Sequence, residues 1–182
     1  MKNKIILIGR MASGKTTMAD RLCEEFGFQK FSLADKIKEI ARDLFGMTEK
    51  DRTLLQKLGY KIREIEPMVW CNYLERKLNV EHENQSLCRD CKFVIDDVRF
   101  LNEYDHFLKL GWFPIKLEVP KEIRLRRIRE LYGEIKEEQL VDPTEIEIDQ
   151  IYCPNVIFEK KYWTIEDKWK ALLGLVEFEK RT

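Results

Sequence analysis

Short apolar runs and helically spaced apolar residues follow one another in turn along the chain. A buried strand is predicted at Lys4–Ile8, which ends in four consecutive apolar residues. A helix is predicted at Lys15–Phe26, because Met18, Leu22 and Phe26 recur at the spacing of one helix face. A glycine-containing loop lies between them. The chain is therefore expected to open with a strand, a loop and a helix.

The same two patterns continue to the end of the chain. Further strands are predicted at Phe28–Ser32, Lys92–Asp96, Phe113–Val119 and Val156–Phe158. Helices are predicted before Gly46, twice between Asp51 and Leu78 with a break near Pro67, at Asn102–Leu110, at Lys121–Tyr132 and after Thr164–Asp167. Glu81–Asp90 is predicted as a loop, and Gly133–Asp149 as an acidic, polar connection. This alternation predicts an α/β fold with three layers, in which helices cover both faces of a central parallel sheet.

Length and charge narrow the class of protein. A chain of 182 residues suits a single domain, 1–182, with room for a small mobile insert. Its 33 basic and 33 acidic residues give a formal charge of zero, so we expect neither nucleic acid nor a lipid surface as a partner. The N-terminal apolar run is too short for a signal peptide or membrane span, which predicts a cytoplasmic protein.

The five cysteines are an odd number, which predicts reduced thiols and no disulfide framework. Cys88 and Cys91 form the single closely spaced pair. A structural zinc site usually has four ligands, and the remaining Cys and His residues offer no second pair. We therefore interpret this stretch as a loop that holds two thiols, with metal binding as the alternative.

The opening loop carries the clearest chemistry in the chain. Residues Gly9–Thr16 match G-x-x-x-x-G-K-[ST] at every fixed position, between a predicted strand and a predicted helix. The glycines allow backbone N–H groups to surround phosphate oxygens, Lys15 can reach the terminal phosphates from a solvent-open loop, and the Thr16 hydroxyl can bind Mg²⁺. The residues expected to hold ATP are Gly9, Met11, Ala12, Ser13, Gly14, Lys15, Thr16 and Thr17.

A phosphate-binding loop (P-loop) is shared by switches, motors and kinases. A guanine-nucleotide switch would carry an Asn-Lys-x-Asp motif, which the sequence lacks. A motor ATPase usually needs a longer chain for its coupling elements. The sequence therefore favours a small kinase.

A second candidate element, Asp96-Asp97-Val98-Arg99, ends the strand predicted after residue 91. An acid delivered beside the P-loop can hold Mg²⁺, directly or through water, and a cation two residues further on can bind a second phosphate. The alternative is a polar strand end with a surface pair of Arg and Asp. Behind a P-loop we favour the functional interpretation.

Four stretches together resemble a known family, the phage-type deoxynucleoside monophosphate kinases of the P-loop nucleoside monophosphate kinase superfamily. They are Gly9–Thr17, Phe31–Lys38, Leu58–Arg63 with Trp70 following, and Ile95–Glu103. The resemblance implies that Asp97 is the recurrent acid and Arg99 its partner, with Asp96 as a water-mediated Mg²⁺ contact. It also implies a lid whose arginines are Arg124 and Arg127. The family's adenine-pocket Asn has no clear counterpart, since Asn155 and Glu159 are both candidates.

Two regions are expected to meet the substrates. A helical segment at 33–78 is predicted to bind the acceptor, with Arg63 on its phosphate, Trp70 against its base and Lys38 as a weaker candidate. A solvated helix face is the alternative for the two cations, and core packing explains the tryptophan equally well. The lid is predicted at 124–145, where the alternative for the arginines is a charged face opposite an apolar stripe.

The sequence thus predicts an ATP- and Mg²⁺-dependent phosphotransferase, either monomeric or homodimeric. We expect it to transfer the γ-phosphoryl group of ATP to a (deoxy)nucleoside monophosphate and so form the diphosphate. One alternative keeps the fold and changes the acceptor to dephospho-coenzyme A, phosphomevalonate or a sugar. Another is a nucleotide-binding regulatory module that acts on a protein partner.

Overall fold

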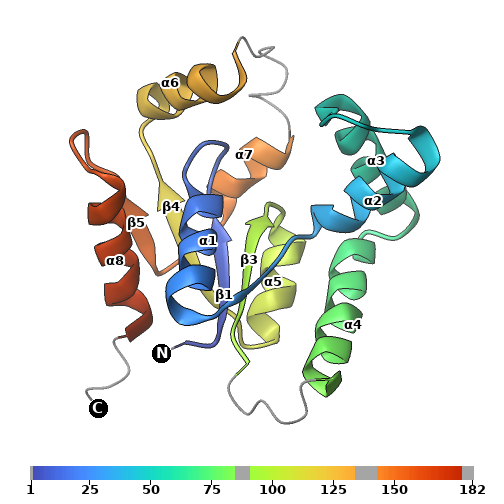
Figure 1. The fold of residues 1–182 in the computed structure, drawn as a ribbon, viewed down its shortest axis with the longest axis horizontal. Coiled ribbons are helices and arrows are strands. Elements are labelled where there is room, and N and C mark those ends of the chain that lie inside the picture. The colour runs from blue at the N-terminus through green and yellow to red at the C-terminus, as the bar shows by residue number, and fades with distance from the viewer. Residues whose placement is uncertain (1, 85–90, 134–142, 178–182) are drawn as a thin grey trace. The chain divides into compact units, whose positions relative to one another are not determined.

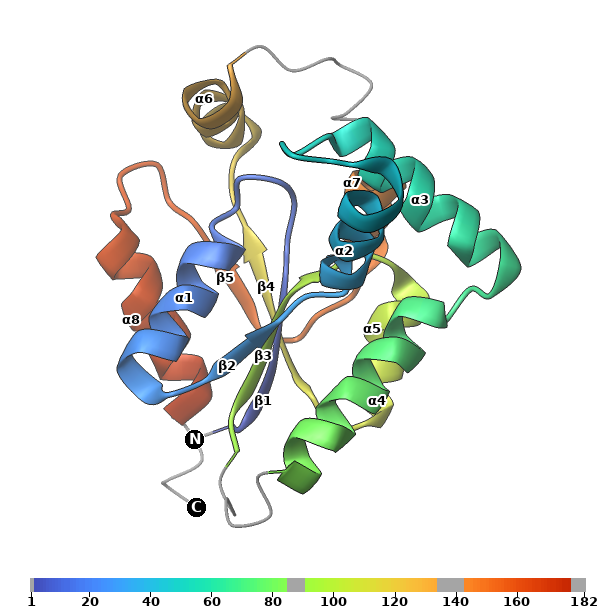
Figure 2. The same cartoon turned by 45° about the vertical axis from the view of Figure 1, so that its right-hand side comes forward.

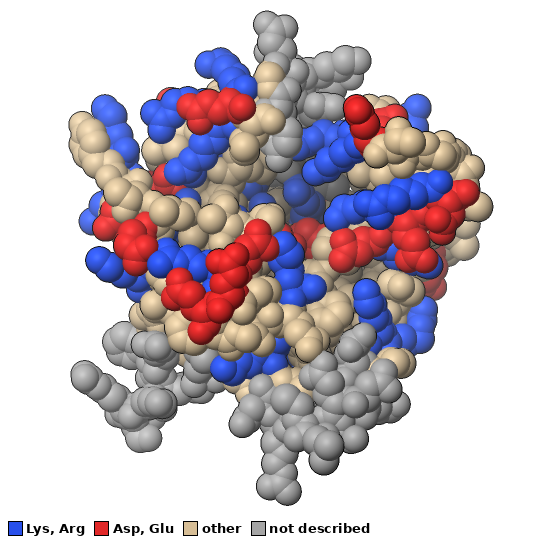
Figure 3. Space-filling model, viewed as in Figure 1, with Lys and Arg blue, Asp and Glu red and all other residues tan. Residues whose placement is uncertain are grey.

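The computed structural model describes residues 2–84, 91–133 and 143–177 (Figure 1). Its residue contacts divide the chain into two compact units. Unit 1 comprises Met1–Lys30 and Lys92–Thr182, and unit 2 is Phe31–Cys91. Each unit is described by itself. On the face shown in Figure 3, acidic and basic side chains are interspersed, as the balanced composition leads one to expect.

A parallel sheet forms the centre of unit 1. Its five strands run in the order β2-β3-β1-β4-β5, and β1 lies in the middle. The strands are β1 (Lys4–Ile8), β2 (Gln29–Phe31), β3 (Phe93–Val98), β4 (Phe113–Glu118) and β5 (Val156–Phe158). Ile5 pairs with Val94 on one side and with Phe113 on the other. The carboxyl ends of these parallel strands therefore share one edge, where loops can combine into a site.

Helices cover both faces of this sheet, which confirms the predicted three-layer α/β fold. Figures 1 and 2 show α1 (Lys15–Phe26) and α8 (Ile165–Glu177) on one side, and α5 (Leu101–Lys109) and α7 (Pro143–Gln150) on the other. Helix α6 (Lys121–Tyr132) follows β4.

Alternating side chains of the strands fill the two cores. Ile5 and Leu7 pack in a cluster with α1 and α8, including Leu22 and Trp169. Their neighbours Ile6 and Ile8 are also fully buried, on the opposite face of the sheet.

Unit 2 is helical, and it contains the segment predicted to bind the acceptor. It consists of α2 (Ala34–Phe45), α3 (Arg52–Ile65) and α4 (Val69–Asn84). Helix α2 is capped at its C-terminus by Gly46, whose φ of 62° is the left-handed conformation that glycine adopts readily. Asp51 caps α3 by accepting a hydrogen bond from the N–H of Leu54 at 3.0 Å.

The structure corrects the predicted elements in three places. Helix α4 continues to Asn84, inside the predicted loop Glu81–Asp90, and β3 runs on to Val98 rather than ending at Asp96. Helix α7 lies in the connection Gly133–Asp149, where the sequence analysis assigned no helix. Among residues 146–150 of this short, acidic helix, whose burial the structure describes, Ile148 is the one buried side chain, too weak a pattern to detect. Residues 85–90 and 134–142 lie outside the described ranges.

Candidate active site

The P-loop between β1 and α1 has the backbone that its sequence predicts. Gly9, Ala12 and Gly14 have φ values of 151°, 60° and 91°. A Cβ atom on Gly9 would lie 2.6 Å from the carbonyl oxygen of Leu117 and 2.7 Å from Oγ of Ser13. Glycine is therefore required at this position both for its conformation and because β4 passes so close.

Lys15 is buried within this loop, with 7% of its surface exposed. Its ammonium group donates to the carbonyl oxygens of Gly9 and Arg10, the latter at 3.0 Å. The expectation of a solvent-open lysine is therefore wrong. The short loop folds its own carbonyl groups around the ammonium, because a buried charge must be hydrogen-bonded.

Thr16 and Asp96 meet at the shared edge of the sheet. The Thr16 hydroxyl donates to Oδ2 of Asp96 at 2.8 Å. Asp96 is 8% exposed, and burial together with the neighbouring Asp97 raises the pKa of its carboxyl group, which the bond from Thr16 only partly offsets. A hydroxyl beside a carboxylate is an oxygen pair that Mg²⁺ takes in phosphate-binding sites.

Asp97 and Arg99 continue the chain from this point. Side chains alternate along a strand, so Asp97 faces the side of the sheet away from Thr16. The N–H of Arg99 donates to Oε2 of Glu103 at 3.0 Å, at the start of α5. The geometry favours Asp96 as the carboxylate nearer the P-loop. The catalytic assignments of Asp97 and Arg99 stay predictions.

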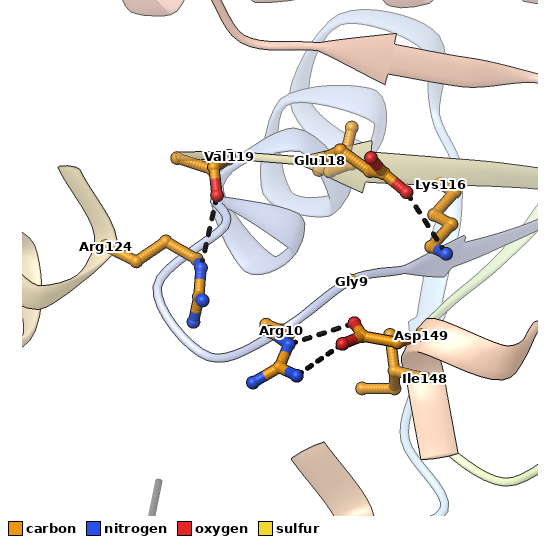
Figure 4. A pocket seen from close by; sticks show the side chains of 9 residues that line it. Gly9, Arg10, Lys116, Glu118, Val119, Arg124, Ile148 and Asp149 are labelled. Carbon is orange, nitrogen blue, oxygen red and sulfur yellow. Dashed lines mark hydrogen bonds and ion pairs between the residues drawn. The ribbon is translucent and has the colours of Figure 1, made fainter. Parts of the chain in front are cut away.

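A pocket of about 280 Å³ opens beside the P-loop on the α7 side of β4 (Figure 4). Five of its lining residues are charged: Arg10, Lys116, Glu118, Arg124 and Asp149. Arg124, only 9% exposed, donates from Nε to the carbonyl of Val119 at 3.2 Å. Nζ of Lys116 lies 3.2 Å from Oε1 of Glu118. The pocket thus brings a predicted lid arginine together with residues that the sequence analysis did not single out.

Arg10 and Asp149 form a bidentate ion pair at this pocket (Figure 4). Nε of Arg10 lies 3.0 Å from Oδ1 of Asp149, and its Nη2 contacts Oδ2. The bond from Arg10 lowers the pKa of Asp149. Arg10 occupies a variable position of the motif, and Asp149 lies in the last turn of α7, a helix that was not predicted. Neither therefore stood out in the sequence.

Arg127, the other predicted lid arginine, is bound to Glu159. Its Nη1 lies 3.0 Å from Oε2 of Glu159 and 3.5 Å from the carbonyl oxygen of Ala12. Lys168 of α8 pairs with the same carboxylate and donates to the carbonyl of Ser13 at 3.1 Å. From the sequence, Glu159 was a candidate only for an adenine contact, and Lys168 was not a candidate for any role. In the sequence alone, Lys168 beside Trp169 has the pattern of a solvent-exposed charge.

Among the predicted acceptor-binding residues, Trp70 is 3% exposed and donates from Nε1 to the carbonyl of Gly59 at 3.3 Å. This burial favours the core-packing alternative over base stacking. Lys38 pairs with Asp35 at 2.9 Å on α2. A Cβ atom on Gly59 would lie 3.3 Å from Nη1 of the half-buried Arg63. The roles of Lys38 and Arg63 stay predictions.

The described cysteines Cys23, Cys71, Cys91 and Cys153 form no disulfide with one another. Cys88, the other member of the candidate metal pair, lies outside the described residues. In the described part of the chain, no group of three or more His, Cys, Asp or Glu residues could hold a metal ion. A Mg²⁺ ion that binds chiefly to phosphates and water does not need such a group. None of the described helices has both the length and the apolar character to cross a membrane.

Comparisons with known proteins agree with the resemblance seen in the sequence. Residues 5–150 match the AAA_18 family, described as an AAA domain. A protein of Acanthamoeba polyphaga mimivirus named "Putative deoxynucleotide monophosphate kinase" is 27% identical over 204 residues, which cover 94% of each chain.

Solved structures share the fold at lower identity. A sugar kinase from Janibacter sp. HTCC2649 has a TM-score of 0.61 at 16% identity and covers 97% of this chain and 95% of its own. Shikimate kinase from Acinetobacter baumannii has a TM-score of 0.57 at 18% identity, with 100% and 97% covered. These likenesses confirm the P-loop kinase fold.

Proposed function

The chain belongs to the AAA_18 family of AAA domains, and on that premise we propose that it is an ATP-dependent phosphotransferase acting on a (deoxy)nucleoside monophosphate. The observation that carries the proposal is the 2.8 Å bond between Thr16 of the P-loop and Asp96 at the end of the adjacent strand. It joins the two elements that a nucleoside triphosphate and its metal ion require.

The chain offers a group for each part of the donor. Gly9, Met11, Ala12, Ser13, Gly14 and Thr17 complete the loop whose N–H groups would hold the phosphates of ATP. Lys15 would exchange its bonds to the loop carbonyls for the terminal phosphates. Thr16 and Asp96 would hold Mg²⁺, with Asp97 nearby, and a bound Mg²⁺ would neutralise charge on the phosphates during transfer.

In the transfer, an oxygen of the acceptor's phosphate attacks the γ-phosphorus while the bond to the β–γ bridging oxygen breaks and ADP leaves. The acceptor is already anionic, so positioning and charge neutralisation carry the reaction without a strong base. Arg124 lines the pocket beside the P-loop and is our candidate for the arginine that neutralises the moving group. Arg127 would have to leave Glu159 to do the same.

The acceptor is proposed from the relative's name and from the whole-length match to it. The relative with the name "Putative deoxynucleotide monophosphate kinase" aligns over 94% of this chain, and this name supports the same substrate class here. We assign acceptor binding to the 33–78 segment, with Lys38 and Arg63, and to Arg99 of unit 1. The lid is assigned to 124–145. On this proposal 1–182 acts as one kinase domain.

A screen by coupled ADP release tests the proposal. Nucleoside and deoxynucleoside monophosphates are compared with dephospho-coenzyme A, phosphomevalonate and sugars, with Lys15→Ala as the control for a contaminating kinase. Stimulation by a monophosphate that Lys15→Ala abolishes is the expected result. Stimulation only by another acceptor would refute the acceptor class. A slow basal rate unaffected by any acceptor would favour a regulatory module.

A further inference from the structure

The back of the P-loop is bound by charged side chains from distant parts of unit 1. A loop that turns N–H groups toward phosphate can direct some of its carbonyl groups the other way, into the protein. Two of these carbonyl groups, those of Ala12 and Ser13, accept hydrogen bonds from Arg127 and Lys168 respectively. Both cations bind the carboxylate of Glu159. We call Arg127, Glu159 and Lys168 the rear cluster.

Burial makes the rear cluster costly to assemble. The side chains of Lys168 and Glu159 are each 2% exposed, and that of Arg127 is 28% exposed. Burial lowers the pKa of Lys168 although Glu159 opposes this change. Burial would raise the pKa of Glu159, but the bonds from Arg127 and Lys168 outweigh it and hold this pKa below its usual value.

An apolar set of similar volume would serve stability as well as this ion pair or better. Apolar side chains, however, could not donate hydrogen bonds to the carbonyl groups of the loop. The ammonium of Lys168 also limits the loop from behind, because a Cβ atom on Gly14 would lie 3.2 Å from it. The cluster thus constrains the peptide groups on both sides of Ser13.

We propose that Lys168 and Glu159 are positioning residues that hold the P-loop in its phosphate-binding conformation from behind. Arg127 adds to this cluster while it is bound to Glu159, before any movement toward the phosphoryl group. Lys168 supplies the donor to the Ser13 carbonyl, and Glu159 fixes Lys168 and Arg127 in place. This role rests on the proposed function in that the loop binds a nucleotide. It requires nothing of the acceptor.

A P-loop that is held in place before the nucleotide binds should also bind the nucleotide more tightly. A loop whose N–H groups already point inward loses no free energy to ordering when a phosphate arrives, whereas a loose loop must be ordered by the ligand. Loss of the rear cluster should therefore weaken nucleotide binding even in a protein that remains well folded.

The test separates positioning from stability by removing the charges singly and together. The variants are Lys168→Met, Glu159→Gln and the double variant, with Lys170→Met on the exposed side of α8 as the matched control. Calorimetry measures the Kd for ADP, thermal unfolding measures stability, and amide hydrogen exchange reports on residues 11–16 without nucleotide.

Each single variant leaves a buried charge without its partner, so both should unfold at lower temperature than the wild type. The double variant should regain stability, because neither of these two charges remains buried. It should still bind ADP about 10- to 100-fold more weakly, the usual effect of one hydrogen bond to a charged group, and its loop amides should exchange faster. Lys170→Met should match the wild type.

A double variant that binds ADP and exchanges its loop amides like the wild type would overturn the proposal and leave the cluster a structural ion pair. The exchange measurement keeps this outcome separate from failure of the proposed function. If the wild type bound no ADP, the proposed function would fail. Faster exchange of residues 11–16 in the double variant would still support positioning, and unchanged exchange would still refute it.

Discussion

Replacement of Gly9 by alanine tests how closely the P-loop is built against the sheet. The added Cβ atom would meet a backbone oxygen of β4 at 2.6 Å, well inside ordinary contact, and the φ of 151° suits glycine alone. Overpacking costs about 1–3 kcal/mol. A backbone conformation of this kind costs about 1–3 kcal/mol more for alanine.

Together these terms predict a loss of about 2–6 kcal/mol in the free energy of unfolding. For a chain of this length the melting temperature should fall by on the order of 10 °C. Nucleotide affinity should fall as well, because relief of the clash with Leu117 must displace the loop. Thermal unfolding and calorimetric titration with ADP measure the two effects.

Two other glycines provide matched controls. Gly27 also has a positive φ, 71°, but a Cβ atom there meets nothing within 4 Å, so Gly27→Ala should cost about 1–2 kcal/mol and leave ADP affinity unchanged. Gly174 lies exposed within α8, and Gly174→Ala should stabilise by about 0.4–1 kcal/mol. A Gly9→Ala protein that melts like Gly27→Ala and binds ADP like the wild type would refute the reasoning.

Other substitutions test individual roles. Lys15→Ala should reduce kcat by about 10²- to 10³-fold, as for loss of one transition-state contact, and undiminished turnover in a folded protein would refute its role. Asp96→Asn should raise the melting temperature at neutral pH without Mg²⁺. The pKa of Asp96 is higher in the folded protein than in the unfolded chain, so the folded protein loses stability as the pH rises through these two pKa values and Asp96 ionises. Asparagine does not ionise and removes this loss. The gain should vanish below both pKa values, and a lower melting temperature at pH 7 would contradict it. Asp97→Asn should chiefly slow the chemical step and alter its Mg²⁺ dependence, whereas Arg99→Ala should raise the acceptor KM with little change in ATP affinity. Steady-state kinetics at varied concentrations of Mg²⁺, ATP and acceptor measure these effects. An equal loss of ATP affinity in both variants would contradict the separate roles of Asp97 and Arg99.

Local patterns were enough to predict the frame of unit 1. Lys4–Ile8 and Lys15–Phe26 have the bounds that the sequence predicts, because a run of apolar residues and a helical repeat are each set by neighbouring residues. The P-loop between them was predicted for the same reason. Its glycines and its lysine stand at fixed spacing within one short segment.

The contacts that the sequence could not predict join residues far apart in the chain. Lys168 reaches Ser13 across 155 positions, and Arg10 reaches Asp149 across 139. Only the parallel order of the strands brings these residues to one edge of the sheet. A charged residue carries no local sign of burial, so Lys168 and Glu159 gave none. Helix α7 was missed for a related reason, since Ile148 is the one buried side chain among its described residues 146–150.

The central claim is that the phosphoryl group goes to an acceptor and not to water. ADP release alone cannot separate these outcomes, so the most direct measurement follows the label of γ-³²P-ATP in the presence of each deoxynucleoside monophosphate. The account predicts label in the deoxynucleoside diphosphate, in amounts equal to the ADP formed, and none with Lys15→Ala. Label that appears only in inorganic phosphate, with every acceptor tried, would contradict it.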